Sequence, residues 1–200
     1  MPSATAEVRI HEILFSIRQV FAEKGFDGAS MQDLARSAGM SVGNFYRYFP
    51  SKAAIVQAMV GLDLAEIEQD FAEILVSSDP MAGLRAKILS RMTEDCMDDG
   101  QLWAEITAAA IRKPEIGIAA TQMEATIVAH LVAIFARVTG RDQSQAEARY
   151  FGHCQMLVML AKAVAMRTSQ CGPASPALAA MVVQTIDQIL TEIANDTAES

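Results

Sequence analysis

The chain has 200 residues, of which 52% are apolar and 20% are charged, and its formal net charge is −8. This apolar fraction supports a packed core and argues against a disordered chain. No apolar run approaches the roughly 18 residues of a membrane span, and residues 1–7 lack the basic start and apolar run of a signal peptide, so we expect a cytoplasmic protein without membrane contact.

The first predicted element is a helix over residues 6–24. Its apolar residues recur at spacings of three and four and form one stripe: Ile10, Ile13, Leu14, Ile17, Val20 and Phe21. Gly25 is the natural end of this helix, and Asp27-Gly28 is a turn. The stripe predicts a helix that packs against the two short helices that follow.

Residues 30–52 predict two short helices joined by a tight turn. Ser30 can cap the first helix, and Gly39 supplies the left-handed residue that ends it. Ser41 can cap the second helix, which Pro50 ends. The spacing of i, i+3 and i+4 predicts that Phe45, Tyr48 and Phe49 form the buried side of the second helix. The residues expected to point away from it are Val42, Asn44, Tyr46 and Arg47.

Two helices with such a turn form a helix-turn-helix, which places its second helix in the DNA major groove. The exposed groups of the second helix are small, hydrogen-bonding and apolar types that suit a groove. The alternative is an ordinary αα-hairpin inside a helical core, and the turn by itself leaves both possibilities open.

The segment GMSVGNFYRYFPSK, from Gly39 to Lys52, closely resembles the TetR family of bacterial transcriptional regulators, as does FDGAS at residues 26–30. This resemblance covers about the first 60 residues. It implies a three-helix DNA-binding head, linked by a long fourth helix to a helical body that binds an effector and dimerises. We therefore expect a DNA-binding domain over residues 1–50 and an effector-binding and dimerisation domain over residues 51–200.

The resemblance also assigns DNA contacts position by position. Those expected closest to bases or sugars are Val42, Gly43 and Asn44, since Val42 can pack on a thymine methyl and Asn44 can bond adenine or a phosphate. Those at positions that commonly hold the phosphate backbone are Tyr46, Arg47, Tyr48 and Lys52. Met31 and Gln32 match positions that sometimes touch DNA, although Met31 departs from the usual residue types.

The charge is unevenly divided along the chain. Residues 1–60 hold six basic and five acidic groups, a net of +1, so the remaining residues carry −9. This asymmetry suits an end that binds DNA and a remainder with another task. A net of +1 is small, so affinity for DNA should depend on a few placed contacts and on dimerisation.

The rest of the chain predicts further helices and no strands. We expect helices over residues 52–76, 80–97, 101–113, 115–138, 144–169 and 175–195, with Asp98-Asp99-Gly100 ending the second of these. The predicted fold is therefore all-α. The last two helices are apolar around most of their circumference. They are either buried inside one subunit or also packed against a second copy, and the TetR resemblance favours a homodimer through these two helices.

The middle helices raise the question of a small-molecule effector. As a set, the residues we expect to line its site are Met92, Cys96, Trp103, Ile106, Met123, Ile127, His130 and Met156. Methionine adapts to irregular apolar shapes, but each of these residues can equally be part of an ordinary core. The TetR resemblance implies an effector pocket in this region, without carrying over any single residue.

Catalysis has little support in the sequence. There is no phosphate-binding glycine loop, no HExxH and no nucleophile-elbow pattern, and the three cysteines fit neither a disulfide framework nor a zinc site. We therefore expect no enzyme, metal or cofactor. The predicted function is a repressor that leaves a palindromic DNA operator when a small apolar molecule binds. The alternatives are an all-helical binding or adaptor protein, and a helical enzyme.

Overall fold

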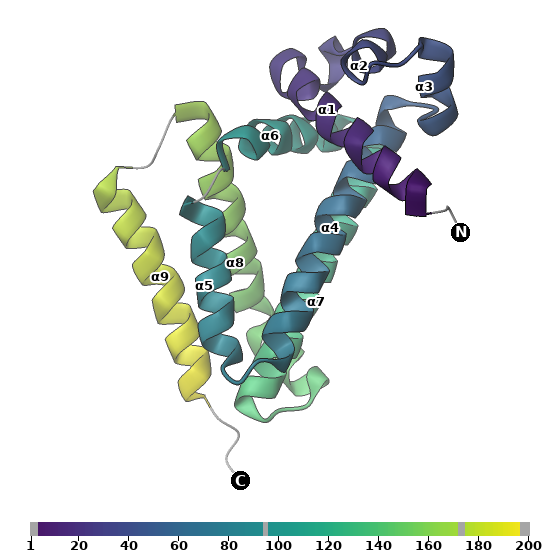
Figure 1. Cartoon of the computed structure of the whole chain (residues 1–200). Coiled ribbons are helices and arrows are strands. Elements are labelled where there is room, and N and C mark those ends of the chain that lie inside the picture. Colours follow the sequence, from purple (N-terminus) through teal and green to yellow (C-terminus); the bar gives the residue numbers. More distant parts are fainter. Residues whose placement is uncertain (1–3, 94–95, 172–174, 197–200) are drawn as a thin grey trace. The chain divides into compact units, whose positions relative to one another are not determined.

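The computed structural model describes residues 4–93, 96–171 and 175–196, with side chains at 8–90, 100–164, 166 and 175–196. Within these residues it contains nine α-helices and no strand, which confirms the all-α prediction (Figure 1). The chain forms two compact units. We call Met1–Leu64 with Gln101–Thr121 the head, and Ala65–Gly100 with Gln122–Ser200 the body.

The head contains α1 (Ala4–Gly28), α2 (Met31–Ser37), α3 (Val42–Tyr48) and the first half of α4 (Lys52–Val76). Gly25 interrupts α1 with a φ of 71°, so the first part of this helix ends where the sequence predicted. The predicted turn at Asp27-Gly28 was wrong, because the chain resumes a helical turn after Gly25. Each of these helices contributes apolar side chains to one core. The buried residues are Ile13, Leu14, Ile17 and Phe21 of α1, Leu34 and Ala35 of α2, Phe45 of α3, and Ile55, Val56 and Met59 of α4.

The head also includes most of α6 (Cys96–Arg112) and the start of α7 (Pro114–Thr139). The prediction that Asp98-Asp99-Gly100 ends a helix was wrong, because these residues lie near the start of α6. Acidic residues are favourable in the first turn of a helix, where the helix dipole is positive. The same acids therefore suit the beginning of this helix better than an end. Residues 101–121 thus belong to the head, although they follow α5 in the chain.

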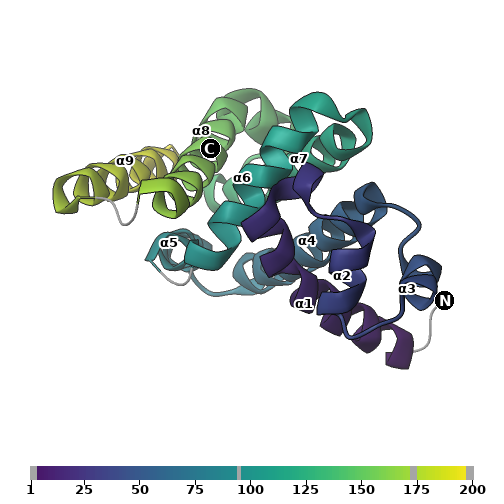
Figure 2. The ribbon, with the colours of Figure 1, turned by 90° about the horizontal axis from the view of Figure 1, so that it is seen from above.

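The body contains the second half of α4, α5 (Pro80–Thr93), most of α7, α8 (Gln143–Cys171) and α9 (Pro176–Asn195). Helices α5, α8 and α9 lie side by side (Figures 1 and 2). Their core residues include Leu84, Leu157 and Ile186. Arg85 of α5 donates two hydrogen bonds to Asp187 of α9, at 2.6 and 2.8 Å, and so joins these helices at the surface.

Two body helices, α7 and α9, are long and apolar enough to pass a test for membrane spans based on length and composition. Core helices of soluble proteins pass the same test. Both helices contribute to the body core: α7 through Leu131, Ile134 and Phe135, and α9 through Leu190 and Ile193. Their apolar character is therefore accounted for in part by packing inside the chain.

Candidate DNA-binding interface

The start of α2 is fixed by a capping box. The Ser30 hydroxyl accepts a hydrogen bond from the Asp33 backbone N–H at 3.1 Å, and the Asp33 carboxylate accepts one from the Ser30 backbone N–H at the same distance. Hydrogen bonds from Lys24 and from Ser30 hold the pKa of Asp33 well below its usual range. These contacts settle where α2 begins, and they confirm the predicted role of Ser30.

The turn between α2 and α3 follows the predicted geometry. Gly39 has a φ of 65°, the Gly39 N–H donates to the Arg36 carbonyl, and the Met40 N–H donates to the Ala35 carbonyl. This pair of bonds is the Schellman arrangement, which needs a left-handed residue at its centre. The Ser41 hydroxyl then accepts from the Asn44 N–H at 3.3 Å and opens α3. The two helices and their turn form the predicted helix-turn-helix.

The inner side of α3 is made by two aromatic residues. Phe45 and Phe49 are buried, and their ring centroids lie 5.6 Å apart. Tyr48 was predicted on this side, but its exposed fraction is 38%. A polar hydroxyl is costly to bury without a partner, so the ring stays near the surface. Tyr48 therefore belongs with the outward residues.

The outer side of α3 is open. Gly43, Asn44 and Arg47 are exposed, Tyr46 has an exposed fraction of 47%, and Val42 is half-buried. A Cβ added at Gly43 would meet no atom within 4 Å, so packing within the chain does not require a glycine there. The residues predicted to point outward are thus at the surface, and the backbone at Gly43 can come close to another molecule.

At the beginning of α2, Met31 is half-buried and Gln32 is exposed. Both side chains therefore reach the surface at the start of α2, and their contact with DNA stays a prediction. Arg36, near the end of α2, is also exposed. The sequence analysis did not select Arg36, although it is the basic residue in the last turn of this helix.

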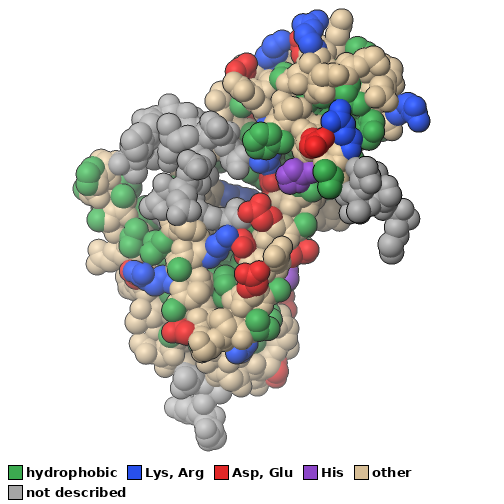
Figure 3. Space-filling view, viewed as in Figure 1, with side chains coloured by type: hydrophobic (Ala, Val, Ile, Leu, Met, Phe, Trp, Pro, Cys, Tyr) green, Lys and Arg blue, Asp and Glu red, His purple; other side chains and the backbone are tan. Residues whose placement is uncertain are grey.

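Most charges of the head are paired with one another. Lys24 lies 2.8 Å from Asp33, Arg18 pairs with Asp63, and Asp27 accepts from Arg112 and Lys113 at 3.3 Å. Arg36 and Arg47 form no ion pair with any residue whose side chain is described. Both are thus available for an external anion. In the body, Figure 3 shows acidic side chains gathered along α4, which carries Glu66, Glu68, Asp70 and Glu73 there.

Lys52 does not share the exposure of the other predicted contacts. It is half-buried, and its Nζ donates to the backbone carbonyls of Phe26, Asp27 and Ala29 at 2.5, 3.2 and 2.9 Å. Burial lowers the pKa of Lys52. An ammonium group has three N–H donors, so all of them have partners inside the head. We therefore leave Lys52 out of the phosphate contacts proposed below.

The residues predicted to line an effector site are distributed over both units. Trp103 and the buried Ile106 belong to the head, whereas Met123, Ile127, His130 and Met156 belong to the body. Met123, Ile127 and His130 are half-buried on α7. The His130 ring stacks on Phe71, with centroids 5.3 Å apart, and its Nε2 lies 4.0 Å from Glu68. The side chains of Met92 and Cys96 lie outside the described residues.

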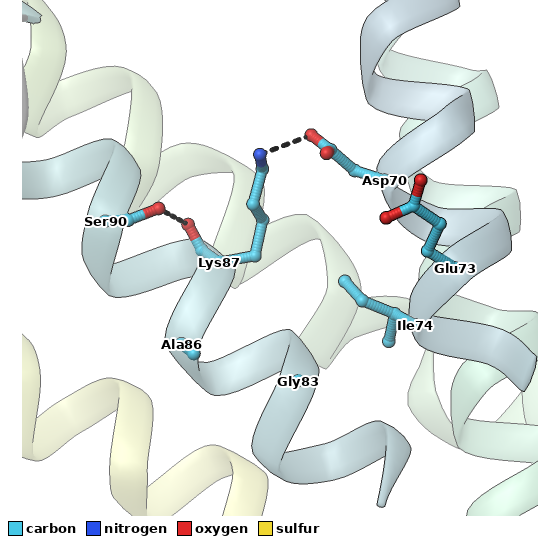
Figure 4. A pocket seen from close by; sticks show the side chains of 7 residues that line it. All are labelled: Asp70, Glu73, Ile74, Gly83, Ala86, Lys87 and Ser90. Carbon is cyan, nitrogen blue, oxygen red and sulfur yellow. Dashed lines mark hydrogen bonds and ion pairs between the residues drawn. The ribbon is translucent and has the colours of Figure 1, made fainter. Parts of the chain in front are cut away.

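The body also has a hollow of about 370 Å³ between α4 and α5 (Figure 4). It is lined by Asp70, Glu73, Ile74, Gly83, Ala86, Lys87 and Ser90, none of which was predicted to bind an effector. Lys87 reaches across from α5 to Asp70 at 2.7 Å. Met156 has an exposed fraction of 47% on α8, so it lies on the surface of this subunit and not inside a cavity.

Comparison with known proteins shows which family of regulators the helix-turn-helix region resembles. Residues 13–59 match the family model "Bacterial regulatory proteins, tetR family". The transcriptional regulator UidR of Escherichia coli strain K12 is 31% identical over 104 residues, which cover 52% of this chain and 53% of UidR. The chain thus spans about half the length of that curated relative. The regulator BetI of Stenotrophomonas maltophilia is 26% identical over 155 residues, covering 74% of this chain and 79% of BetI.

Among solved structures, GusR of Salmonella enterica superposes with a TM-score of 0.72 and 26% sequence identity, covering 92% of this chain and 95% of GusR. The likeness therefore extends through the body as well as the head. From the match at residues 13–59, the named relatives and the shared fold, the chain carries the DNA-binding domain of the tetR family of bacterial regulatory proteins and has the fold of these regulators.

Proposed function

We propose that the chain is a sequence-specific transcriptional regulator that inserts α3 into the major groove of double-stranded DNA. The observation that carries this proposal is the open outer face of α3, with Gly43 leaving room for close approach and Arg47 free of ion pairs within the described residues. A small side chain lets the helix backbone approach a sugar or phosphate, and an unpaired guanidinium suits a phosphate. The family assignment and the regulators UidR and BetI support the same activity.

The side chains on this face divide into two groups by chemistry. Val42 and Asn44 have the apolar and amide groups that contact thymine methyls and adenine edges. Tyr46, Arg47 and Tyr48 have donors suited to phosphate oxygens, which fix the position of the protein without selecting sequence. Gln32 and Met31, at the start of α2, are placed for additional contacts, and Arg36 is a further exposed cation on α2.

The body has a surface suited to a second copy of the chain. Met156 and Met159 of α8 and Met181 of α9 have exposed fractions of 47, 61 and 64%, and Phe151 of α8 is exposed as well. Such side chains are costly to leave in water, and packing them against their equivalents in a two-fold four-helix bundle would bury them. The proposed dimer would present two α3 helices to one palindromic operator, about 34 Å apart.

A small apolar effector is the proposed signal, and repression is the proposed mode. Half-buried Met123 and Ile127 on α7 are candidates for contact with an apolar molecule, with His130 of the same helix as a third. An effector that binds better to a form with wrongly spaced heads would lower operator affinity by about 5–150-fold, for a coupling of about 1–3 kcal/mol. We expect this regulator to act in the cytoplasm, where its operator is.

Selection of random duplex DNA by the purified chain tests the proposal. We expect enrichment of a palindrome with two half-sites about one helical turn apart. The variant Tyr46→Ala/Arg47→Ala should bind all duplexes more weakly and give much less enrichment at the same protein concentration, while Lys162→Ala, which removes an exposed cation of the body, should enrich like wild type. Enrichment at the wild-type level by the double variant would show that another surface contacts DNA, and no enrichment by the wild type would favour an adaptor protein.

A further inference from the structure

The last turn of α1, after Gly25, and the adjoining Ala29 direct three carbonyl groups toward a single side chain. The Ala29 N–H donates to the Gly25 carbonyl at 3.1 Å within this turn. The carbonyl oxygens of Phe26, Asp27 and Ala29 all accept hydrogen bonds from the Lys52 Nζ. These partners lie 23 to 26 residues from Lys52 in the sequence. One ammonium group thus supplies the donors that three carbonyls need.

The aromatic ring beside this ammonium adds a second attraction. The Lys52 Nζ lies 4.9 Å from the centroid of the Phe26 ring, and Phe26 itself is buried and stacks on Phe21 with centroids 5.9 Å apart. A cation held over an aromatic face is stabilised by the negative charge density of the ring. The half-buried ammonium is therefore held by backbone and ring together.

Two other polar groups of the same segment are also bonded within the head. The Phe26 N–H donates to Glu105 Oε2 at 3.3 Å, and the Asp27 carboxylate pairs with Arg112 and Lys113. The next residue after Ala29 is Ser30, which caps α2. The position of this segment consequently sets where α2 begins, and through the Gly39 turn it sets where α3 lies.

We propose that Lys52 is a positioning residue of the helix-turn-helix, which ties the segment 26–29 to the start of α4, and that it does not contact phosphate. This inference rests on the proposed function, because the outer face of α3 is what Lys52 would position. It changes the expected interface: the cations that meet DNA would be Arg47 and Arg36, and Lys52 would act on DNA affinity only through the shape of the head.

Amine labelling of the wild-type protein tests the location of Lys52 without DNA and without substitution. With a limiting amount of an amine-acetylating reagent, peptide mass spectrometry should find Lys52 modified several-fold more slowly than Lys24 and Lys162, whose side chains are about half exposed. Addition of duplex DNA should leave the Lys52 rate unchanged. Fast labelling in free protein that DNA then suppresses would overturn the proposal in favour of a phosphate contact.

Two substitutions separate the two roles further. Lys52→Met removes all three donors, and Lys52→Arg keeps the positive charge but replaces a compact ammonium by a planar fork. If Lys52 positions residues 26–29, both variants should melt about 5–10 °C below wild type, because the carbonyls of Phe26, Asp27 and Ala29 lose well-placed donors. Each variant that folds should keep the wild-type slope of log affinity against log salt concentration for a random-sequence duplex.

Arg47→Met is the matched control, since Arg47 is exposed and unpaired among the described side chains. It should melt like wild type and lower the salt slope by about one, the effect of one lost phosphate contact. If Lys52→Arg instead melts and binds like wild type while Lys52→Met lowers the slope by about one, the proposal is overturned. If the wild type binds no duplex, the proposed function fails, while labelling and melting still decide where Lys52 lies.

Discussion

Replacement of Gly43 by leucine should separate the stability of the head from its affinity for DNA. Gly43 lies in the first turn of α3, its φ is outside the left-handed region, and an added Cβ would meet no atom within 4 Å. A helix former is therefore favourable at this position, and its side chain would extend only into solvent. Replacing glycine by a better helix former is worth about 0.5–1 kcal/mol, which in a chain of this size raises the melting temperature by about 1–4 °C.

The same side chain should obstruct DNA. A leucine at position 43 would stand where we propose that α3 approaches a sugar or phosphate. Forcing extra atoms into a packed contact costs about 1–3 kcal/mol, so affinity for the selected operator should fall by about 5–150-fold. Fluorescence polarisation with a labelled operator duplex measures this loss, and differential scanning calorimetry of the free protein measures the gain in stability.

Gly43→Ala is the control for the backbone effect, because it gains the same helix propensity with only one methyl group. We expect alanine to melt like the leucine variant and to bind DNA more tightly than the leucine variant does. If leucine and alanine bind the operator equally well, α3 does not approach DNA at Gly43, and the proposed orientation of the helix is wrong.

Four further predictions follow from particular contacts. Gly39→Val should destabilise the head by about 1–2 kcal/mol in thermal melts because of the φ of 65°, and Gly39→Asn should recover most of the loss. Asn44→Ala should change which operator sequences are enriched in duplex selection if the amide contacts a base, whereas a uniform loss would indicate a phosphate contact. Asp33→Asn should melt below wild type at neutral pH, and this difference should shrink as pH falls below about 4. The reason is that the unfolded chain then takes up a proton at Asp33 while the folded chain, in which the pKa of Asp33 is lowered, does not, so protonation progressively favours the unfolded chain. Met159→Glu should shift sedimentation toward a species of 21.6 kDa, and an unchanged dimer would place the interface elsewhere.

Local signals account for the parts of the fold that were predicted well. The Ser30 cap, the Gly39 turn and the Ser41 cap depend on residues no more than five apart, and each appears in the structure as expected. The helix over residues 52–76 also matches α4 at both ends. These features can be predicted from sequence because the interacting groups are close neighbours in the chain.

The features that were missed depend on distant partners or on equivocal signals. The environment of Lys52 is made by carbonyls more than twenty residues away, and no local pattern marks them. Asp98 and Asp99 suit either end of a helix when judged only by solvation, and the structure has them near the start of α6. Tyr48 satisfies the spacing of a buried position, but its hydroxyl favours the surface.

Oxidative footprinting of the tyrosines tests the central claim most directly. Tyr46 and Tyr48 are exposed in the free protein and lie on the helix that we propose enters the groove. Hydroxyl-radical oxidation, quantified by peptide mass spectrometry, should become several-fold slower at both residues when the chain is saturated with its selected duplex. The exposed Val76 of α4, in the body, should keep its rate. If both tyrosines react equally fast in the free and the fully bound protein, α3 is not the surface that binds DNA.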